Sequence, residues 1–209
     1  MPTVEKITDS CTSLGEGPHW DVSSQSLYFV DISGKQILKY TPSTNKLTKA
    51  TIEKSPSFII PIENKKNQFL VSLRNDLAVV SWDGESEDVK ILENICGVET
   101  SEETPYVFND AKCDSSGRLW VGAHSLAADF AKTQPLGVLY SIDSTKQLKI
   151  HAHKIRCANG MAFNDKTKKM FFIDSLAGSV DQFDFDIITL SLALFVRIQI
   201  DVTFFNTQF

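Results

Sequence analysis

The chain has 209 residues, 42% hydrophobic and 22% charged, which is the composition of a globular protein with a sizeable core. Its net charge of −5 comes from 26 acidic and 21 basic residues without a basic stripe, which argues against nucleic acid as a partner. The N-terminus lacks the apolar segment of a secretory signal, and the four cysteines form no CxxC pair. We therefore expect a cytoplasmic protein with reduced thiols and no structural zinc site.

Short apolar and aromatic segments follow one another along the chain, with turn residues between them. No long segment keeps a helical period, so a parallel α/β sheet, which needs crossover helices, is disfavoured. The sequence predicts an all-β protein. The expected strand segments are residues 26–32, 36–41, 69–73, 77–82, 118–123, 137–143, 169–175 and 179–186.

These segments belong to a repeat. A polar turn, an apolar-aromatic strand, an aspartate and a second strand recur, and the turns begin at Asp21, Asn64, Asp114 and Asn164. The intervals of 43, 50 and 50 residues are typical of the four-stranded blades of a β-propeller. A β-sandwich has similar strands but no reason to repeat them at this interval. Four copies predict either a small propeller or a chain that stops before its ring is complete.

Three polar residues occupy the same place relative to the repeated turns. Glu16, Asn109 and Asn159 each lie five residues before the start of a turn. Equal offsets in a rotational repeat place side chains on one ring around the axis, and one carboxylate with two amide oxygens suits a hard cation such as Ca²⁺. The alternative for each asparagine is a plain turn role, because "ND" and "NG" are common turn dipeptides.

The stretch "GEGPHW" holds Glu16 between two glycines, which lets the backbone turn sharply or another group approach closely. Trp20 is expected to bury its ring and hold the segment against the core. The alternative is a surface turn with an incidental glutamate. Ser13 and Ser125 have no visible Ser-His-Asp setting, so no catalytic residue is assigned.

The motifs "LGEGPHWD", "SFIIP", "FNDAKCDSSGRLWVGA", "ANGMAFNDKTKKMFFIDS" and "VDQFDFD" closely resemble the regucalcin (senescence marker protein), gluconolactonase and luciferin-regenerating enzyme family, and its insect members most. The match covers residues 4–186. The resemblance implies a six-bladed β-propeller, of which about four blades are present in residues 1–186. It also implies one divalent cation, Ca²⁺ or Zn²⁺, in the axial channel.

By this resemblance, Glu16 and Asn159 are metal ligands and Asn109 belongs to the substrate-binding site. The function implied is that of a metal-dependent lactone hydrolase and calcium-binding protein, a monomer that acts on a small-molecule lactone, with no membrane partner. The family's third ligand and proposed general base is an aspartate in a "PDG" motif, which this sequence lacks. Asp201 lies near the expected distance but has other neighbours, so it is not assigned. Val107 replaces a family arginine, which predicts a different substrate preference.

Residues 187–209 form an apolar segment unlike the family pattern, and they are expected to be an aberrant tail. Their uninterrupted apolar run is about ten residues, too short to cross a bilayer. With the "PDG" aspartate missing, we expect a truncated and impaired lactonase. The alternatives are a non-catalytic calcium-binding or ligand-binding propeller, and an unstable fragment with exposed strand edges.

Overall fold

The computed structural model describes residues 3–4, 6–7, 12–101, 105–126 and 135–199. Within them the chain is all-β except for one 3₁₀ turn, Pro42–Thr44. It divides into two compact units, Met1–Ile95 and Cys96–Phe209. No helix in the described part of the chain is long and apolar enough to cross a membrane.

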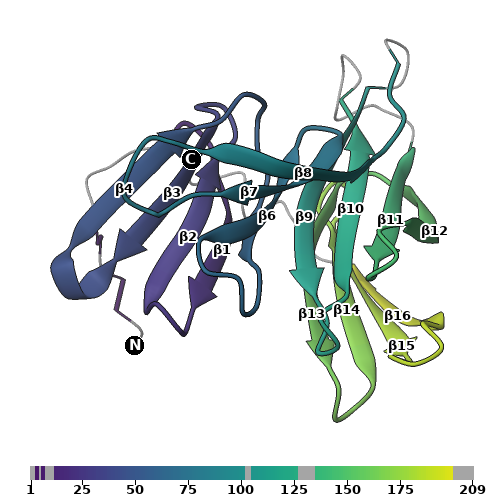
Figure 1. Cartoon of the computed structure of the whole chain (residues 1–209). Helices are drawn as coiled ribbons and strands as arrows, with labels where there is room; N and C mark the ends of the chain where they lie inside the picture. The colour runs from purple at the N-terminus through teal and green to yellow at the C-terminus, as the bar shows by residue number, and fades with distance from the viewer. Residues whose placement is uncertain (1–2, 5, 8–11, 102–104, 127–134, 200–209) are drawn as a thin grey trace. The chain divides into compact units, whose positions relative to one another are not determined.

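The first unit holds two four-stranded sheets in which the strands follow in chain order (Figure 1). The first four strands, and likewise the next three, pair antiparallel with their neighbours in the chain. The last strand of the second sheet runs two residues past the boundary of the unit. The strands are β1 (Gly15–Asp21), β2 (Ser26–Asp31), β3 (Gln36–Thr41), β4 (Lys46–Thr51), β5 (Ile59–Pro61), β6 (Gln68–Leu73), β7 (Asp76–Ser81) and β8 (Lys90–Gly97).

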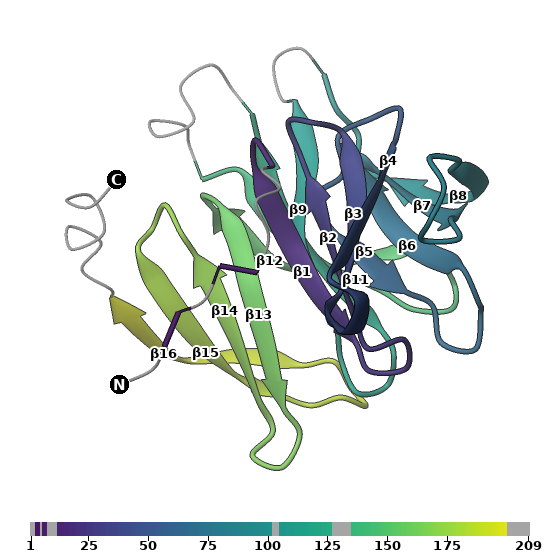
Figure 2. The ribbon, with the colours of Figure 1, turned by 90° about the vertical axis from the view of Figure 1, so that its left-hand side faces the viewer.

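The second unit repeats this architecture with two more antiparallel meanders, and Figure 2 shows the last of them from β13 to β16. A four-stranded meander that recurs along the chain is the blade of a β-propeller. The all-β propeller prediction, with four blades in this chain, is therefore confirmed. The strands are β9 (Tyr106–Cys113), β10 (Leu119–Ser125), β11 (Gly137–Ile142), β12 (Leu148–Ile155), β13 (Ala158–Asn164), β14 (Lys169–Asp174), β15 (Ser179–Phe185) and β16 (Leu192–Gln199).

In three of the four repeated turns the residue that begins the turn closes it with its own side chain. Asp21 accepts hydrogen bonds from the backbone N–H groups of Ser23 and Ser24, at 3.1 Å each. Asp114 accepts the backbone N–H of Ser116 at 2.9 Å and the indole Nε1–H of Trp120 at 3.0 Å. These local bonds explain why acidic and amide residues mark the repeat in the sequence.

Each unit has its own core on facing sides of its two sheets. In the first unit Tyr28, Phe69 and Trp82 form an aromatic cluster with ring centroids 4.9 to 6.4 Å apart. In the second unit Trp120, which is fully buried, packs edge-on against Phe185 at 5.5 Å. Because successive side chains of a strand point to opposite faces of the sheet, every second residue of these strands faces the core.

Two features differ from the sequence expectations or add to them. Trp20 is 45% exposed, so the prediction that it buries its ring is wrong: on β1 it points away from the core face that holds Tyr28 and Val30. Within the expected tail, β16 pairs with β15, and Arg197 makes a bidentate ion pair with Asp181 at 2.6 Å. The division at residue 186 stays a prediction, and residues 200–209 lie outside the described part.

Candidate functional site

Three of the four blades carry a β-bulge in their first strand, next to the candidate residue or including it. Gly17 and Pro18 on β1 lie opposite one residue of β2, immediately after Glu16. Asn109 and Asp110 on β9 lie opposite one residue of β10. A bulge redirects the side chains beside it and is common next to active sites.

On β13 the pair Asn159 and Gly160 lies opposite Ile173 of β14. The short first strand of the second blade, β5, pairs with β6 without a shift. The three blades with a candidate residue are therefore the three whose first strand carries a bulge. The equal spacing along the sequence does not by itself require this correspondence.

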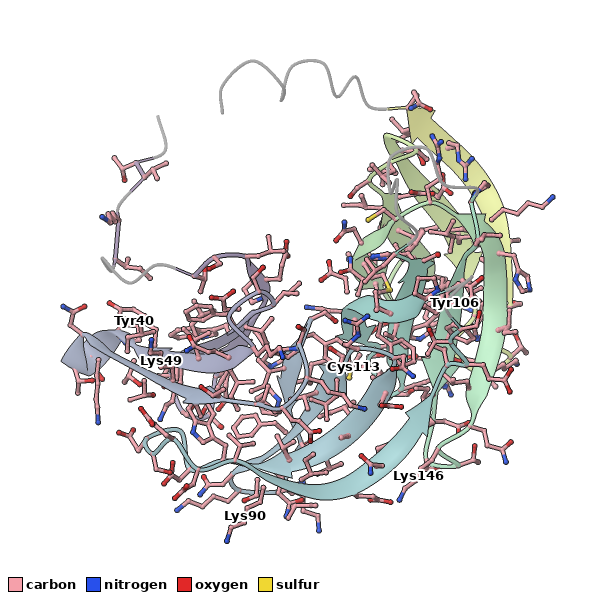
Figure 3. All side chains as sticks on the ribbon, turned by 90° about the horizontal axis from the view of Figure 1, so that it is seen from above. Tyr40, Lys49, Lys90, Tyr106, Cys113 and Lys146 are labelled. Atoms are coloured by element: carbon pink, nitrogen blue, oxygen red, sulfur yellow. The ribbon has the colours of Figure 1, made fainter. Side chains whose placement is uncertain are left out.

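In the second unit the two asparagines, 50 residues apart in sequence, contact each other. Asn109 Nδ2 donates to the backbone carbonyl of Ala158 at 2.7 Å and to Asn159 Oδ1 at 3.2 Å. Asn159 Nδ2 donates to Ser175 Oγ at 2.8 Å and lies 3.6 Å from Cys157 Sγ. β9 and β13, the first strands of the two blades, bring these side chains together; Figure 3 marks the ends of β9 by Tyr106 and Cys113.

This chain of bonds determines which way each amide points. A carbonyl only accepts hydrogen bonds, so the atom of Asn109 that faces Ala158 must be the NH₂ group. That NH₂ group also faces Asn159, whose atom on this side must then be Oδ1. Asn109 thus uses both hydrogens of its NH₂ group for hydrogen bonds within the protein. The side-chain acceptors of Asn109 and Asn159 are their Oδ1 atoms.

Glu16 in the first unit is half-buried at the start of β1. It is the one charged residue in the lining of a hollow of about 260 Å³, with Pro18, Leu27, Phe29 and other apolar groups around it. Gly17 has φ +56°, and a Cβ on it would lie 2.7 Å from the carbonyl oxygen of Ser57. The glycine after Glu16 is therefore required by a left-handed backbone and by a close neighbouring chain.

Two buried aspartates hold the backbone just ahead of the candidate ligands, and the sequence analysis did not single them out. At the end of β2, Asp31 accepts the N–H groups of Ser13 at 2.9 Å, Leu14 at 3.1 Å and Gly34 at 2.9 Å. Burial by itself raises the pKa of Asp31, but the hydrogen bonds from these N–H groups together lower it by more. The pKa of Asp31 therefore lies below its ordinary value. Ser13 and Leu14 lie three and two residues before Glu16.

Asp174 at the end of β14 makes the same contacts in the second unit. It accepts the N–H groups of Arg156 and Cys157 at 2.9 Å each, three and two residues before Asn159, and that of Ala177 at 3.3 Å. The aspartate that ends the repeated strand, in "FVD" and "FID", was the signal that could have identified both residues. Its role is to fix the entry of the bulged strand.

Other chemistry in the described residues does not compete with this site. No group of three or more His, Cys, Asp or Glu side chains in the described part could hold a metal ion. Ser141 Oγ lies 2.7 Å from His151 Nε2, but Ser141 is 2% exposed and thus closed to a substrate. Val107, at the position of the family's arginine, is buried on β9 beside His124, and burial lowers the pKa of His124 to about 4. Asp201 lies outside the described residues.

The fold and these bulged strands define a class of protein: a β-propeller whose candidate site residues lie on the first strands of its blades. The model of the SMP-30/Gluconolactonase/LRE-like region matches residues 14–201. The chain belongs to this family.

Individual relatives agree with the family. The chain is 26% identical to regucalcin of Danio rerio over 191 residues, which cover 91% of this chain and 61% of the relative. It is 29% identical to regucalcin of Oryctolagus cuniculus over 189 residues, with 89% and 60% covered. The chain thus spans about three-fifths of the length of these curated relatives.

Solved structures show the same fold. A luciferin-regenerating enzyme, 39% identical, superposes with a TM-score of 0.82 over 90% of this chain and 60% of the other. A protein described as a calcium-binding protein, regucalcin, from Agrobacterium tumefaciens is 17% identical, with a TM-score of 0.74 over 92% of this chain and 61% of the other.

Proposed function

We propose that this chain carries part of the divalent-cation site of a lactone hydrolase, with Glu16 and Asn159 as ligands and Asn109 facing the substrate. The single observation that supports it most is the Asn109–Asn159 chain of hydrogen bonds, which directs amide donors into the protein and leaves amide oxygens as acceptors. Membership of the family, whose members include regucalcins and gluconolactonases, supports this class of reaction.

The donor set suits a hard cation. Glu16 offers a carboxylate, and the two asparagines offer neutral oxygens, which Ca²⁺ prefers, whereas neither histidine nor cysteine lies at these three positions. Ca²⁺ and Zn²⁺ are both candidates. A cation bound here would polarise a lactone carbonyl and stabilise the negative charge that develops on its oxygen.

The residues of this chain have separate tasks in that reaction. Glu16 supplies negative charge from a strand fixed by Asp31 and Gly17. Asn109, whose NH₂ group donates within the protein, would offer its Oδ1 to the substrate. Water adds to the lactone carbonyl carbon, the ring C–O bond breaks, and a hydroxy acid is released. No residue of this chain is assigned as the general base that accepts the proton of the water.

A second function therefore stands beside the first: a calcium-binding or ligand-binding propeller without turnover. The unassigned general base favours it. The two functions share the cation site and differ in hydrolysis.

The test is to titrate the purified chain with CaCl₂ and with ZnCl₂ by calorimetry, and to follow opening of glucono-1,5-lactone by alkali uptake. We expect binding in the wild type and at least tenfold weaker binding in Glu16→Gln, which keeps the shape but removes the charge. Glu63→Gln, in a turn outside the site, is the matched control. Binding with hydrolysis supports the lactonase, binding without hydrolysis supports the second function, and a wild type that binds neither ion overturns both.

A further inference from the structure

Ser175 stands at the end of the hydrogen-bond chain through the two asparagines and has no role in the function proposed above. It follows Asp174 directly, at the turn after β14, and its side chain is exposed. Asn159 Nδ2 donates to Ser175 Oγ at 2.8 Å. This is the shortest contact of that amide group.

The hydroxyl adds a short hydrogen bond to an amide that its other partners hold weakly. The bond from Asn109 to Asn159 Oδ1 is 3.2 Å long, at the outer limit of an ordinary N–H···O bond, and the contact with Cys157 Sγ is a weak sulfur contact at 3.6 Å. Without the serine, the side-chain amide of Asn159 has one long bond and one weak contact to hold it. With the serine, the amide gains a short hydrogen bond that holds its position. The orientation follows from the donor Asn109 Nδ2 on the Oδ1 side, because a hydroxyl can accept or donate.

The position of Ser175 is itself fixed. The carboxylate of Asp174 binds the N–H groups of Arg156, Cys157 and Ala177, so the turn that carries Ser175 and the strand that carries Asn159 are joined at the same buried residue. The backbone N–H of Ser175 also donates to the carbonyl of Cys157 at 3.1 Å. Ser175 Oγ therefore meets Asn159 as part of one rigid turn.

We infer that Ser175 is a positioning residue, which fixes the side-chain amide of Asn159 with Oδ1 available as a ligand and Nδ2 turned away. The inference rests on the proposed function in so far as the ligand is a cation. Outer partners of metal ligands commonly change metal affinity by 10- to 100-fold, and an exposed hydroxyl belongs at the lower end of this range.

The experiment uses Ser175→Ala, with Ser175→Thr to restore a hydroxyl. Ser33→Ala is the matched control, because Ser33 is an exposed serine in the corresponding turn of the first blade. The first readout needs no cation: in ¹⁵N-labelled protein, the Asn159 side-chain amide should show two distinct protons with an NOE to the β protons of Ser175. In Ser175→Ala this amide should lose its protection from solvent exchange, and Ser175→Thr should regain it.

The second readout is the Kd for CaCl₂. We expect it to rise about tenfold in Ser175→Ala and to stay within about twofold of the wild type in Ser175→Thr and Ser33→Ala. An unchanged Asn159 amide signal in Ser175→Ala, or an unchanged Kd in a chain that binds Ca²⁺, would overturn the inference. If the wild type binds no Ca²⁺, the cation site fails while the amide readout still decides the role of Ser175.

Discussion

The close approach of β10 and β13 in the second unit offers a sharp test of how packing supports the candidate site. Gly122 lies opposite the Asn109–Asp110 bulge, and a Cβ built on it would lie 2.2 Å from the Cβ of Ala158. Ala158 supplies the carbonyl that fixes the Asn109 amide and directly precedes Asn159. Gly122→Ala should therefore strain the second unit at the residue on which the site depends.

The magnitude follows from the geometry. Ordinary contacts of a Cβ begin at 3.4 Å, so the two strands would have to part by more than 1 Å. Overpacking of this kind costs about 2 to 3 kcal/mol. Ala158→Gly removes the clashing methyl group, and the next atoms that an alanine at 122 would meet lie at 3.5 and 3.7 Å. Alone, Ala158→Gly should cost about 1 kcal/mol, because glycine loses more backbone freedom on folding than alanine.

The assay is urea unfolding of the wild type, both single variants and the double variant. We expect Gly122→Ala/Ala158→Gly to be about as stable as Ala158→Gly, which gives a coupling of about 2 kcal/mol in the double-mutant cycle. Gly122→Ala alone should lower the Tm by about 5 to 10 °C. If the two costs simply add, the strands do not approach as closely as the structure shows, and the reasoning is refuted.

Three further predictions concern stability. Burial lowers the pKa of His124 to about 4, below the unfolded value near 6.5, so the unfolded chain binds the proton first. This group should lower the free energy of unfolding by up to about 3 kcal/mol between pH 6.5 and 4. His124→Gln should remove that part of the pH dependence and leave the part from His151, whose pKa burial also lowers to about 4. Arg197→Met should lower the free energy of unfolding by about 1 to 3 kcal/mol, because it leaves buried Asp181 without its partner. Amide hydrogen exchange along β16 should become faster, and equal exchange rates would contradict the pairing. Gly17→Ala should lower the free energy of unfolding, measured by thermal melting, by about 2 kcal/mol or more. Gly15→Ala should lower it clearly less, because the added Cβ would meet only the movable hydroxyl of a threonine, and equal losses would contradict this account.

Much of the fold was readable in the sequence because it rests on local chemistry. Alternating apolar residues define the strands, and turn residues that bond to their own backbone, such as Asp21 and Asp114, mark the repeat. The period of the turns then selected the propeller over the sandwich. The same repeat selected Glu16, Asn109 and Asn159, because residues at equal offsets in a repeat occupy equivalent places.

Some expectations depended on contacts that local pattern does not encode. Trp20 was expected to be buried because of its size, yet alternation on β1 places it on the side of the sheet away from the core. The apolar segment after residue 186 carried no family pattern, but residues 192–199 form β16 because β15 offers them a strand edge and Asp181 offers Arg197 a bidentate partner.

By itself, the sequence determined the strands, the repeat, the family and the three candidate residues, since each of these depends on residue type and spacing. Only the tertiary structure decided that Asn109 and Asn159 touch across 50 residues, that the carbonyl of Ala158 and the hydroxyl of Ser175 hydrogen-bond to their amides, and that bulges precede their turns. The physical reason is that a bulge, a side-chain amide's orientation and a close strand approach are set by partners distant in the chain, which spacing along one strand does not specify.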